Sequence, residues 1–180
     1  MGLLKKILIT GGPGSGKTTL INELRKRKFE CREEIVRNLT MKGKNDGEDQ
    51  LFLKKPLEFS QSIMKLRIQQ FYKKSKNKLV FFDRGVHEIV AYLNFINFEN
   101  NNDLLNQCKN IKYDSIFVLM PWEEIYKRDN CRYESYKESV KIFEEILKIY
   151  QYLKMEVKII ERNTVQKRID IILNHLNNYL

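Results

Sequence analysis

Histidine and cysteine are scarce in this chain of 180 residues, and their scarcity limits the chemistry it can perform. Only two histidines occur, His87 and His175, which argues against a histidine-based metal centre and against a Ser-His-Asp triad. The three cysteines, Cys31, Cys108 and Cys131, are widely spaced and odd in number. They therefore predict reduced thiols, and neither a disulfide framework nor a zinc site.

Long apolar runs are also lacking. No stretch reaches the roughly eighteen apolar residues that a membrane-spanning helix needs. The first residues lead directly into an apolar strand pattern, without the separate apolar segment and small-residue cleavage site of a signal peptide. We therefore expect a cytoplasmic protein with no stable insertion into a membrane.

Guanine-reading and motor-type features are missing as well. The chain has no Asn-Lys-x-Asp stretch, the usual reader of guanine, so ATP is expected in preference to GTP. It also has no helical second domain after the core, which a ring-forming motor would need. These absences favour a small ATP-binding enzyme over a GTPase or a motor.

Positive charge is abundant, with a net charge of +10. Such an excess could bind nucleic acid, a phosphoinositide or an anionic membrane surface. However, the lysines are scattered through every segment, and no block of about five or six like charges occurs. We favour a lysine-rich background around a cleft for an anionic nucleotide, and keep nucleic acid or phosphoinositide as the less favoured partners.

The motif G-x-x-x-x-G-K-[ST] occurs at residues 11–18, between an apolar run and a helical pattern. Glycines let the backbone curl closely around a phosphate, and the exposed N–H groups and helix N-terminus attract its charge. Lys17 is expected to reach the β- and γ-phosphates, and the Thr18 hydroxyl to bind Mg²⁺. The sequence thus predicts a nucleoside triphosphate site formed by Gly11, Gly12, Pro13, Gly14, Ser15, Gly16, Lys17, Thr18 and Thr19.

Hydrophobic patterns alternate between strands and helices along the chain. Strands are expected at residues 6–10, 29–32, 79–82, 115–119 and 156–161. Helices are expected from residue 16 and over 33–41, 56–76, 86–97, 104–108, 134–155 and 164–180, the clearest apolar stripe being Tyr136, Val140, Phe143, Leu147 and Tyr150. This alternation predicts one α/β domain over residues 1–180, a three-layer α/β/α sandwich around a parallel sheet. Residues 42–55 lack periodicity and are expected to form a mobile loop.

Charged side chains follow the predicted strands, at the edge of the sheet where a ligand should bind. Asp83 comes directly after the third strand and could hold Mg²⁺ or its water; alternatively, it caps the next helix. Arg84 is either a phosphate-binding group for a second substrate or a surface charge. Glu34 could be a general base toward an acceptor hydroxyl, or a glutamate that stabilises a helix N-terminus. Arg37, one turn later, could pair with Glu34 or contact the substrate.

Arg128 and Arg132 are four residues apart and therefore share one helical face. Two guanidinium groups there could close over the triphosphate and neutralise charge as the γ-phosphoryl group leaves. The alternative is a solvated basic face, which Asp129 and Glu134 nearby would also suit. On the first interpretation, residues 122–135 form a lid.

The chain resembles predicted ATPases described as "AAA domain" proteins, which are related to the ribosylnicotinamide kinase domain of NadR and, more remotely, to deoxynucleoside and thymidylate kinases. The resemblance extends from about residue 5 to residue 175 and rests on residues 10–19, Glu34-x-x-Arg37, Val80-Phe81-Phe82-Asp83-Arg84-Gly85, and Pro121-Trp122-Glu123-Glu124-Ile125-Tyr126 followed by Arg128 and Arg132.

This resemblance implies a P-loop NTPase fold of kinase type, with a five-stranded parallel sheet in the order 2-3-1-4-5. It implies that Lys17 and Thr18 handle phosphate and Mg²⁺, and that Asp83 with Arg84 matches the Asp-Arg pair of nucleoside and nucleotide kinases. Glu34 matches the carboxylate after strand two, and Arg128 with Arg132 matches the lid arginines. The acceptor does not follow from the resemblance, because strand two is unusually polar and the loop at 42–55 is long.

Together these patterns predict a protein that binds Mg-ATP. The first hypothesis is a kinase for a nucleoside-like or nucleotide-like small molecule, with Lys17, Glu34, Asp83, Arg128 and Arg132 as catalytic residues. In it, Glu34, Arg37 and Arg84 contact the acceptor, and Thr18 and Asp83 hold the metal. The second hypothesis is a nucleotide-dependent ATPase or GTPase switch that binds phosphoinositide or nucleic acid through its basic surface.

Overall fold

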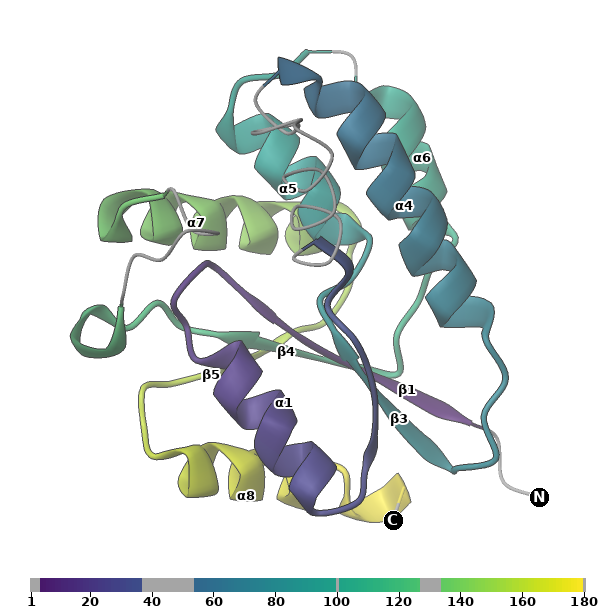
Figure 1. Ribbon diagram of the computed structural model, residues 1–180, viewed down its shortest axis with the longest axis vertical. Helices are drawn as coiled ribbons and strands as arrows, with labels where there is room; N and C mark the ends of the chain where they lie inside the picture. Colours follow the sequence, from purple (N-terminus) through teal and green to yellow (C-terminus); the bar gives the residue numbers. More distant parts are fainter. Residues whose placement is uncertain (1–3, 37–53, 100, 127–133, 180) are drawn as a thin grey trace, which may run out of the picture.

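The computed structural model describes residues 4–36, 54–99, 101–126 and 134–179 of the chain. Its centre is a parallel five-stranded sheet in the order β2-β3-β1-β4-β5. The strands are β1 (Lys5–Gly11), β2 (Glu30–Arg32), β3 (Leu79–Asp83), β4 (Ser115–Leu119) and β5 (Lys158–Ile160). The predicted three-layer α/β architecture and strand order are confirmed (Figure 1).

The three central strands are buried on both faces, which explains their nearly continuous apolar sequences. The edge strands β2 and β5 are short and more exposed. In the register of the sheet, Ile9 of β1 lies beside Asp83 of β3, and Gly11 lies beside Leu119 of β4. The residues that follow these strands therefore meet at the same edge of the sheet.

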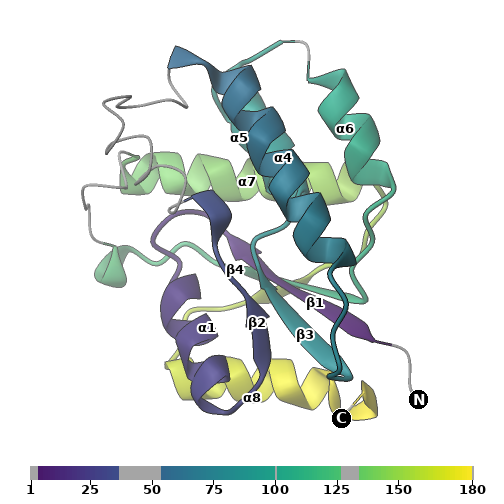
Figure 2. The ribbon, with the colours of Figure 1, turned by 45° about the vertical axis from the view of Figure 1, so that its right-hand side comes forward.

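Two layers of helices cover the sheet (Figures 1 and 2). One face packs against α1 (Lys17–Lys26) and α8 (Val165–His175), and its core includes Ile9, Phe81 and Phe117. The other face packs against α4 (Pro56–Tyr72), α5 (His87–Phe95), α6 (Asn102–Lys109) and α7 (Tyr136–Tyr152). Short 3₁₀ helices, η1 (Glu123–Ile125) and η2 (Asn177–Tyr179), complete the described elements.

Several predicted helix ends need correction. The helix that begins at Pro56 ends at Tyr72 and not at Lys76, because Lys73 adopts an extended backbone. The helix expected at 86–97 spans His87–Phe95, and the helix expected at 134–155 spans Tyr136–Tyr152. Thr164 caps α8 as a typical N-cap residue would, since its hydroxyl accepts a hydrogen bond from the Lys167 N–H at 3.3 Å.

The buried face of α7 is rotated relative to the predicted apolar stripe. Tyr150 is buried as expected, but Val140, Phe143 and Leu147 are only half-buried. The most deeply buried positions are instead Ser139, Ile142, Ile146 and Ile149. The rotation brings Ser139 against the phosphate-binding loop, so the helix packs a polar residue where a pure apolar pattern would not place one.

Some expectations lie outside the described residues. These include nearly all of the loop expected at 42–55, most of the helix expected at 33–41, and the lid residues 127–133. Within the part of the chain that the structure describes, no helix is both long enough and apolar enough to cross a membrane.

Candidate functional site

The phosphate-binding loop connects the end of β1 at Gly11 to the start of α1 at Lys17. Gly14 and Gly16 have φ angles of +72° and +82°, in the left-handed region that favours glycine. A Cβ on Gly14 would lie 2.4 Å from the Tyr126 ring, and one on Gly16 would lie 2.7 Å from Arg168. The two glycines thus permit both the turn and the close approach of the neighbouring segments.

Lys17 lies inside this loop. Its ammonium group donates hydrogen bonds to the carbonyl oxygens of Gly11 and Gly12, each at 2.7 Å, and to the Ser15 hydroxyl at 3.1 Å. Burial, and secondarily the positive charge of Arg84, lower the pKa of Lys17 to about 7. The amine is therefore poised to gain a proton when negative charge arrives beside it.

A single pocket of about 520 Å³ lies beside the loop and extends toward α4 and α5. We divide its lining into two parts. The loop half consists of residues 13–19, Trp122, Ile125, residues 163–165 and Arg168. The helix half consists of Glu34, Val36, Phe59, Ser60, Ile63, Arg67, Arg84, Glu88, Ile89, Tyr92 and Glu134.

Arg84 connects acidic groups in the helix half. Its guanidinium donates to Glu34 at 3.1 Å and to Glu88 at 3.4 Å. Burial alone would lower the pKa of Arg84, but Glu34 and the other nearby acidic groups raise it well above its ordinary value. Arg84 has a φ of +71°, which is unusual outside glycine. With its side chain 14% exposed and paired to two carboxylates, Arg84 is a largely buried cation of the pocket and not a surface charge.

Glu88 holds this arrangement from α5. It is 3% exposed and accepts the Gly85 N–H at 2.8 Å as well as the Arg84 hydrogen bond. Glu88 was not predicted from the sequence, because it falls within an apolar helical pattern. A glutamate that interrupts this apolar pattern, three residues after the Asp-Arg-Gly stretch, is the signal that could have indicated it.

Asp83 ends β3 and is almost fully buried, whereas Thr18 is exposed and lines the pocket. Burial, and then the charge of Glu34, raise the pKa of the Asp83 carboxyl group. Its Oδ1 has no hydrogen-bond partner among the described residues. Asp83 does not cap the next helix, because α5 begins at His87 and Val86 occupies the N-cap position.

These two residues fit a magnesium ion that is shared with a nucleotide. Mg²⁺ is usually held by one or two protein oxygens together with phosphate oxygens and waters, and a hydroxyl and a carboxylate are suitable donors. The described residues contain no group of three or more acidic, histidine or cysteine side chains that could hold a metal alone. Any ion here would therefore depend on the phosphates, with Thr18 and Asp83 as its protein partners.

Arg67, on α4, is a second buried cation of the helix half. It is 3% exposed, lines the pocket, and its Nε and Nη1 atoms have no hydrogen-bond partner among the described residues. The apolar side chains of Phe59, Ile63 and Ile89 lie in the same half. Arg67 was not predicted, although an arginine between Met64 and Phe71, on the apolar side of α4, was a usable signal.

Arg168 is the missed residue of the loop half. It lies in the first turn of α8, is 2% exposed, and donates to the Ser15 carbonyl oxygen at 2.9 Å. Its guanidinium carbon lies 5.7 Å from the centre of the Trp122 ring. Nothing local in the sequence connects residue 168 to the loop, so only the fold could bring them together.

The structure unites some predicted site residues and leaves others undescribed. Lys17, Thr18, Glu34 and Arg84 line one pocket, with Asp83 directly behind Arg84 in the chain. Residues 13–16 and 19 line the same pocket, whereas Gly11 and Gly12 are described but do not line it. Three predicted residues lie outside the described ranges: Arg37, Arg128 and Arg132. Of the expected lid at 122–135, the described parts that line the pocket are Trp122, Ile125 and Glu134.

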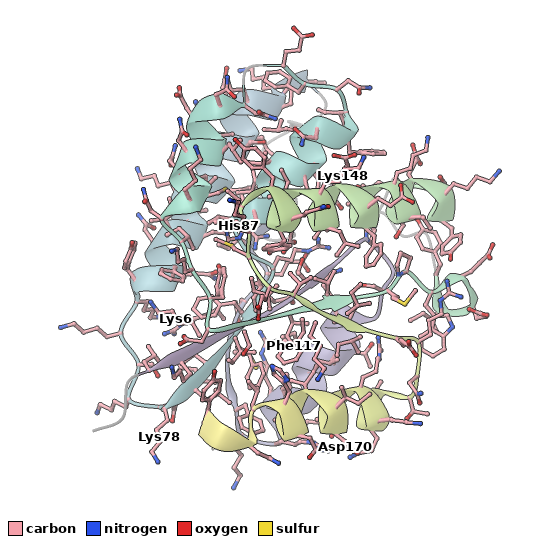
Figure 3. The ribbon with its side chains drawn as sticks, turned by 180° about the vertical axis from the view of Figure 1, so that it is seen from behind. Lys6, Lys78, His87, Phe117, Lys148 and Asp170 are labelled. Carbon is pink, nitrogen blue, oxygen red and sulfur yellow. The ribbon has the colours of Figure 1, made fainter. Side chains whose placement is uncertain are left out.

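His87 takes no part in the pocket lining. It is buried on the α7 side of the sheet, opposite to Phe117, which lies between the sheet and α8 (Figure 3). Burial lowers the pKa of His87 to about 4, so the imidazole is neutral at physiological pH. His87 therefore packs as a neutral ring in the core, away from the pocket.

The phosphate-binding loop and the sheet order define a P-loop NTPase with a kinase-like fold. The chain belongs to the family described as "AAA domain", whose model matches residues 6–168. No curated protein sequence matches this chain. Its solved structural neighbours include nucleoside and nucleotide kinases.

Three of these neighbours cover nearly all of the chain. Deoxyadenosine kinase from M. mycoides, with bound dATP, has a TM-score of 0.68 at 17% identity and covers 96% of this chain and 99% of its own. Thymidylate kinase from Candida albicans has a TM-score of 0.69 at 20% identity, covering 98% and 92%. NadR protein in complex with NR has a TM-score of 0.74 at 15% identity, covering 98% of this chain and 51% of its own. At these identities the likeness establishes the fold alone.

Proposed function

We propose that this protein is a small-molecule kinase, which transfers the γ-phosphoryl group of Mg-ATP to a hydroxyl group of a nucleoside-like or nucleotide-like acceptor. The observation that carries the proposal is the continuity of the pocket. The phosphate-binding loop and a carboxylate–guanidinium pair, Glu34 with Arg84, line the same cavity. A protein that only bound or hydrolysed a nucleotide would not need a second, largely buried compartment beside the phosphates.

In this proposal the loop half binds ATP. Backbone N–H groups of the loop and Lys17 hold the phosphates, and Mg²⁺ is held by Thr18 and Asp83 together with phosphate oxygens. When bound, Mg²⁺ neutralises charge on the phosphates. Arg128 and Arg132 complete this part as cations that approach the transferring group. ATP is preferred over GTP because the chain lacks the usual guanine-reading stretch.

The helix half binds the acceptor. Glu34 accepts the proton of the attacking hydroxyl group, and Arg84 keeps the Glu34 carboxylate charged and oriented. Arg37, three residues after Glu34 in the sequence, adds a polar contact in this proposal. Arg67 hydrogen-bonds an oxygen of the acceptor, and the apolar walls pack against its flat part. The likeness to deoxyadenosine kinase, thymidylate kinase and NadR supports an acceptor of nucleoside or nucleotide type.

The test is ATP consumption with Mg²⁺ in the presence of a panel of nucleosides, nucleotides and related metabolites. We expect one acceptor class to raise turnover well above the background rate and to become phosphorylated. Lys17→Ala provides the blank. If no acceptor raises turnover while ATP still binds tightly, the kinase proposal is wrong.

The net charge of +10 favours one second candidate, a nucleotide-dependent switch that binds phosphoinositide or nucleic acid. Such binding would be strongly weakened by salt, because it would rest on charge. It would also be insensitive to Glu34→Gln, since no proton is taken from an acceptor. Vesicle and nucleic-acid binding at two salt concentrations, with and without nucleotide, distinguishes this candidate from the kinase.

A further inference from the structure

Two side chains outside the motif hold the phosphate-binding loop. Ser139, in the first turn of α7, donates its hydroxyl hydrogen to the Pro13 carbonyl oxygen at 2.5 Å, across 126 residues of sequence. Arg168, in the first turn of α8, donates from Nη1 to the Ser15 carbonyl oxygen at 2.9 Å, across 153 residues. Ser139 and Arg168 are buried. We call these two residues the loop anchors.

The anchors fix the direction of two peptide units. In a trans peptide the carbonyl group of one residue and the N–H group of the next point in opposite directions, and the described residues contain no cis peptide bond. Holding the Pro13 carbonyl toward α7 therefore turns the Gly14 N–H away from α7. Holding the Ser15 carbonyl toward α8 likewise turns the Gly16 N–H away from α8.

Two further carbonyl groups of the loop are held from within it. Lys17 donates to the carbonyl oxygens of Gly11 and Gly12, and the Ser15 hydroxyl also donates to Gly12. The anchors supply the donors for Pro13 and Ser15, which the motif itself does not supply. An anion-binding site of this kind needs successive backbone N–H groups that converge on one point. By fixing the peptide units after Pro13 and Ser15, the anchors favour that arrangement.

Close packing leaves the anchors little freedom. A Cβ on Gly12 would lie 2.5 Å from the Ser139 carbonyl oxygen, so α7 approaches the loop through the space that glycine leaves. Arg168 is stacked beside the Trp122 ring at 5.7 Å, and a Cβ on Gly16 would lie 2.7 Å from its Nη2. The anchors therefore restrain the loop before any nucleotide arrives, which lowers the ordering cost of binding.

We propose that Ser139 and Arg168 are positioning residues, which aim the Gly14 and Gly16 N–H groups at the phosphates of the bound nucleotide. This inference goes beyond the proposed kinase reaction. Even without an acceptor, this protein would need the two residues to bind a triphosphate.

The test uses inorganic tripolyphosphate, a ligand with the phosphates but no base, and adenosine, a ligand with the base but no phosphates. We expect Ser139→Ala and Arg168→Met each to weaken tripolyphosphate binding about tenfold, because each leaves one loop peptide free to turn. Adenosine binding should be unchanged. Ser62→Ala, on α4, and Lys167→Met, exposed on α8, are matched controls that keep wild-type affinity.

A readout of single amides separates positioning from general loosening of the fold. In protein labelled with ¹⁵N-glycine, tripolyphosphate should shift the Gly14 and Gly16 amide protons downfield in the wild type. Arg168→Met should lose the Gly16 shift and keep the Gly14 shift, and Ser139→Ala should do the reverse. Arg168→Lys, which retains a cationic donor, should recover part of the affinity.

Two results would overturn the proposal. One is tripolyphosphate affinity within about twofold of wild type in both variants, with both glycine shifts retained. The other is an equal loss of tripolyphosphate and adenosine binding, which would mean that the substitutions damage the whole site. The tripolyphosphate affinities and the glycine amide shifts involve no acceptor, so failure of these two readouts is distinguishable from failure of the kinase proposal.

Discussion

The cationic side chains in the two halves of the pocket have different hydrogen-bond partners. In the loop half, the cations Lys17 and Arg168 bond to backbone carbonyl oxygens of the phosphate-binding loop. In the helix half, Arg84 bonds to the carboxylates of Glu34 and Glu88. The first arrangement shapes a backbone surface for an anion, and the second keeps a carboxylate charged and oriented. The contrast supports the proposed division, in which the loop half holds the triphosphate and the helix half holds the acceptor.

The largest effect is expected when the cation inside the phosphate-binding loop is removed. Lys17→Met should reduce turnover on the order of a thousandfold, because a buried charge that faces the transferring group is lost. Steady-state ATP turnover measures the effect. Lys26→Met, exposed at the end of the same helix, is the control and should retain wild-type turnover. Comparable losses in both variants would contradict a special role for Lys17.

The next change acts on the helix half alone. Glu34→Gln should lower kcat about a hundredfold or more while ATP affinity stays the same, because the amide cannot accept the proton of the acceptor. The kcat with the best acceptor and the dissociation constant for ATP are measured separately for each variant. Glu33→Gln alters the exposed neighbouring carboxylate and should have no effect. If Glu34→Gln instead weakens ATP binding with kcat intact, the division into two halves is wrong.

A smaller effect is expected where the helix half contacts the acceptor. Arg67→Met should raise the KM for the acceptor roughly tenfold to a hundredfold, the cost of losing a charged hydrogen bond in a buried site. The KM for ATP should not change. Lys65→Met, exposed on the same helix, is the matched control. If only the KM for ATP increases, Arg67 contacts the nucleotide and not the acceptor.

The smallest effect concerns the protonation of Lys17. Its pKa of about 7 without nucleotide should rise when phosphate charges lie beside it, so binding takes up a proton above neutral pH. Affinity for Mg-ATP should therefore fall by less than about tenfold between pH 7 and pH 8. Calorimetry in buffers of different ionisation enthalpy measures the proton uptake. Lys17→Arg, which stays charged, should abolish it.

The sequence was sufficient for the phosphate-binding motif and for the fold. The motif is contiguous, the parallel sheet followed from the alternation of strands with helices, and the order of the strands followed from the family resemblance. Asp83 and Arg84 could be singled out because they directly follow an apolar strand. Such features are local, so a pattern in one stretch of sequence is enough to find them.

The missed residues are those whose roles depend on packing. Arg67, Glu88 and Arg168 each lie in a helix, and each is buried against the pocket by the way its helix crosses the sheet. Helical periodicity indicates which side of a helix is apolar, but it does not indicate which buried charge faces a cavity. The buried face of α7 could not be predicted for the same reason, because it depends on the contact of Ser139 with the loop.

The most direct test of the account follows the transferred group itself. The protein is incubated with Mg²⁺, with ATP that carries ¹⁸O on the non-bridging oxygens of its γ-phosphate, and with the acceptor panel. Mass spectrometry then locates the label. We predict that the labelled phosphoryl group appears intact on a hydroxyl of one acceptor class, and that Glu34→Gln greatly slows its appearance. Label found only in inorganic phosphate, with every acceptor, would contradict the account.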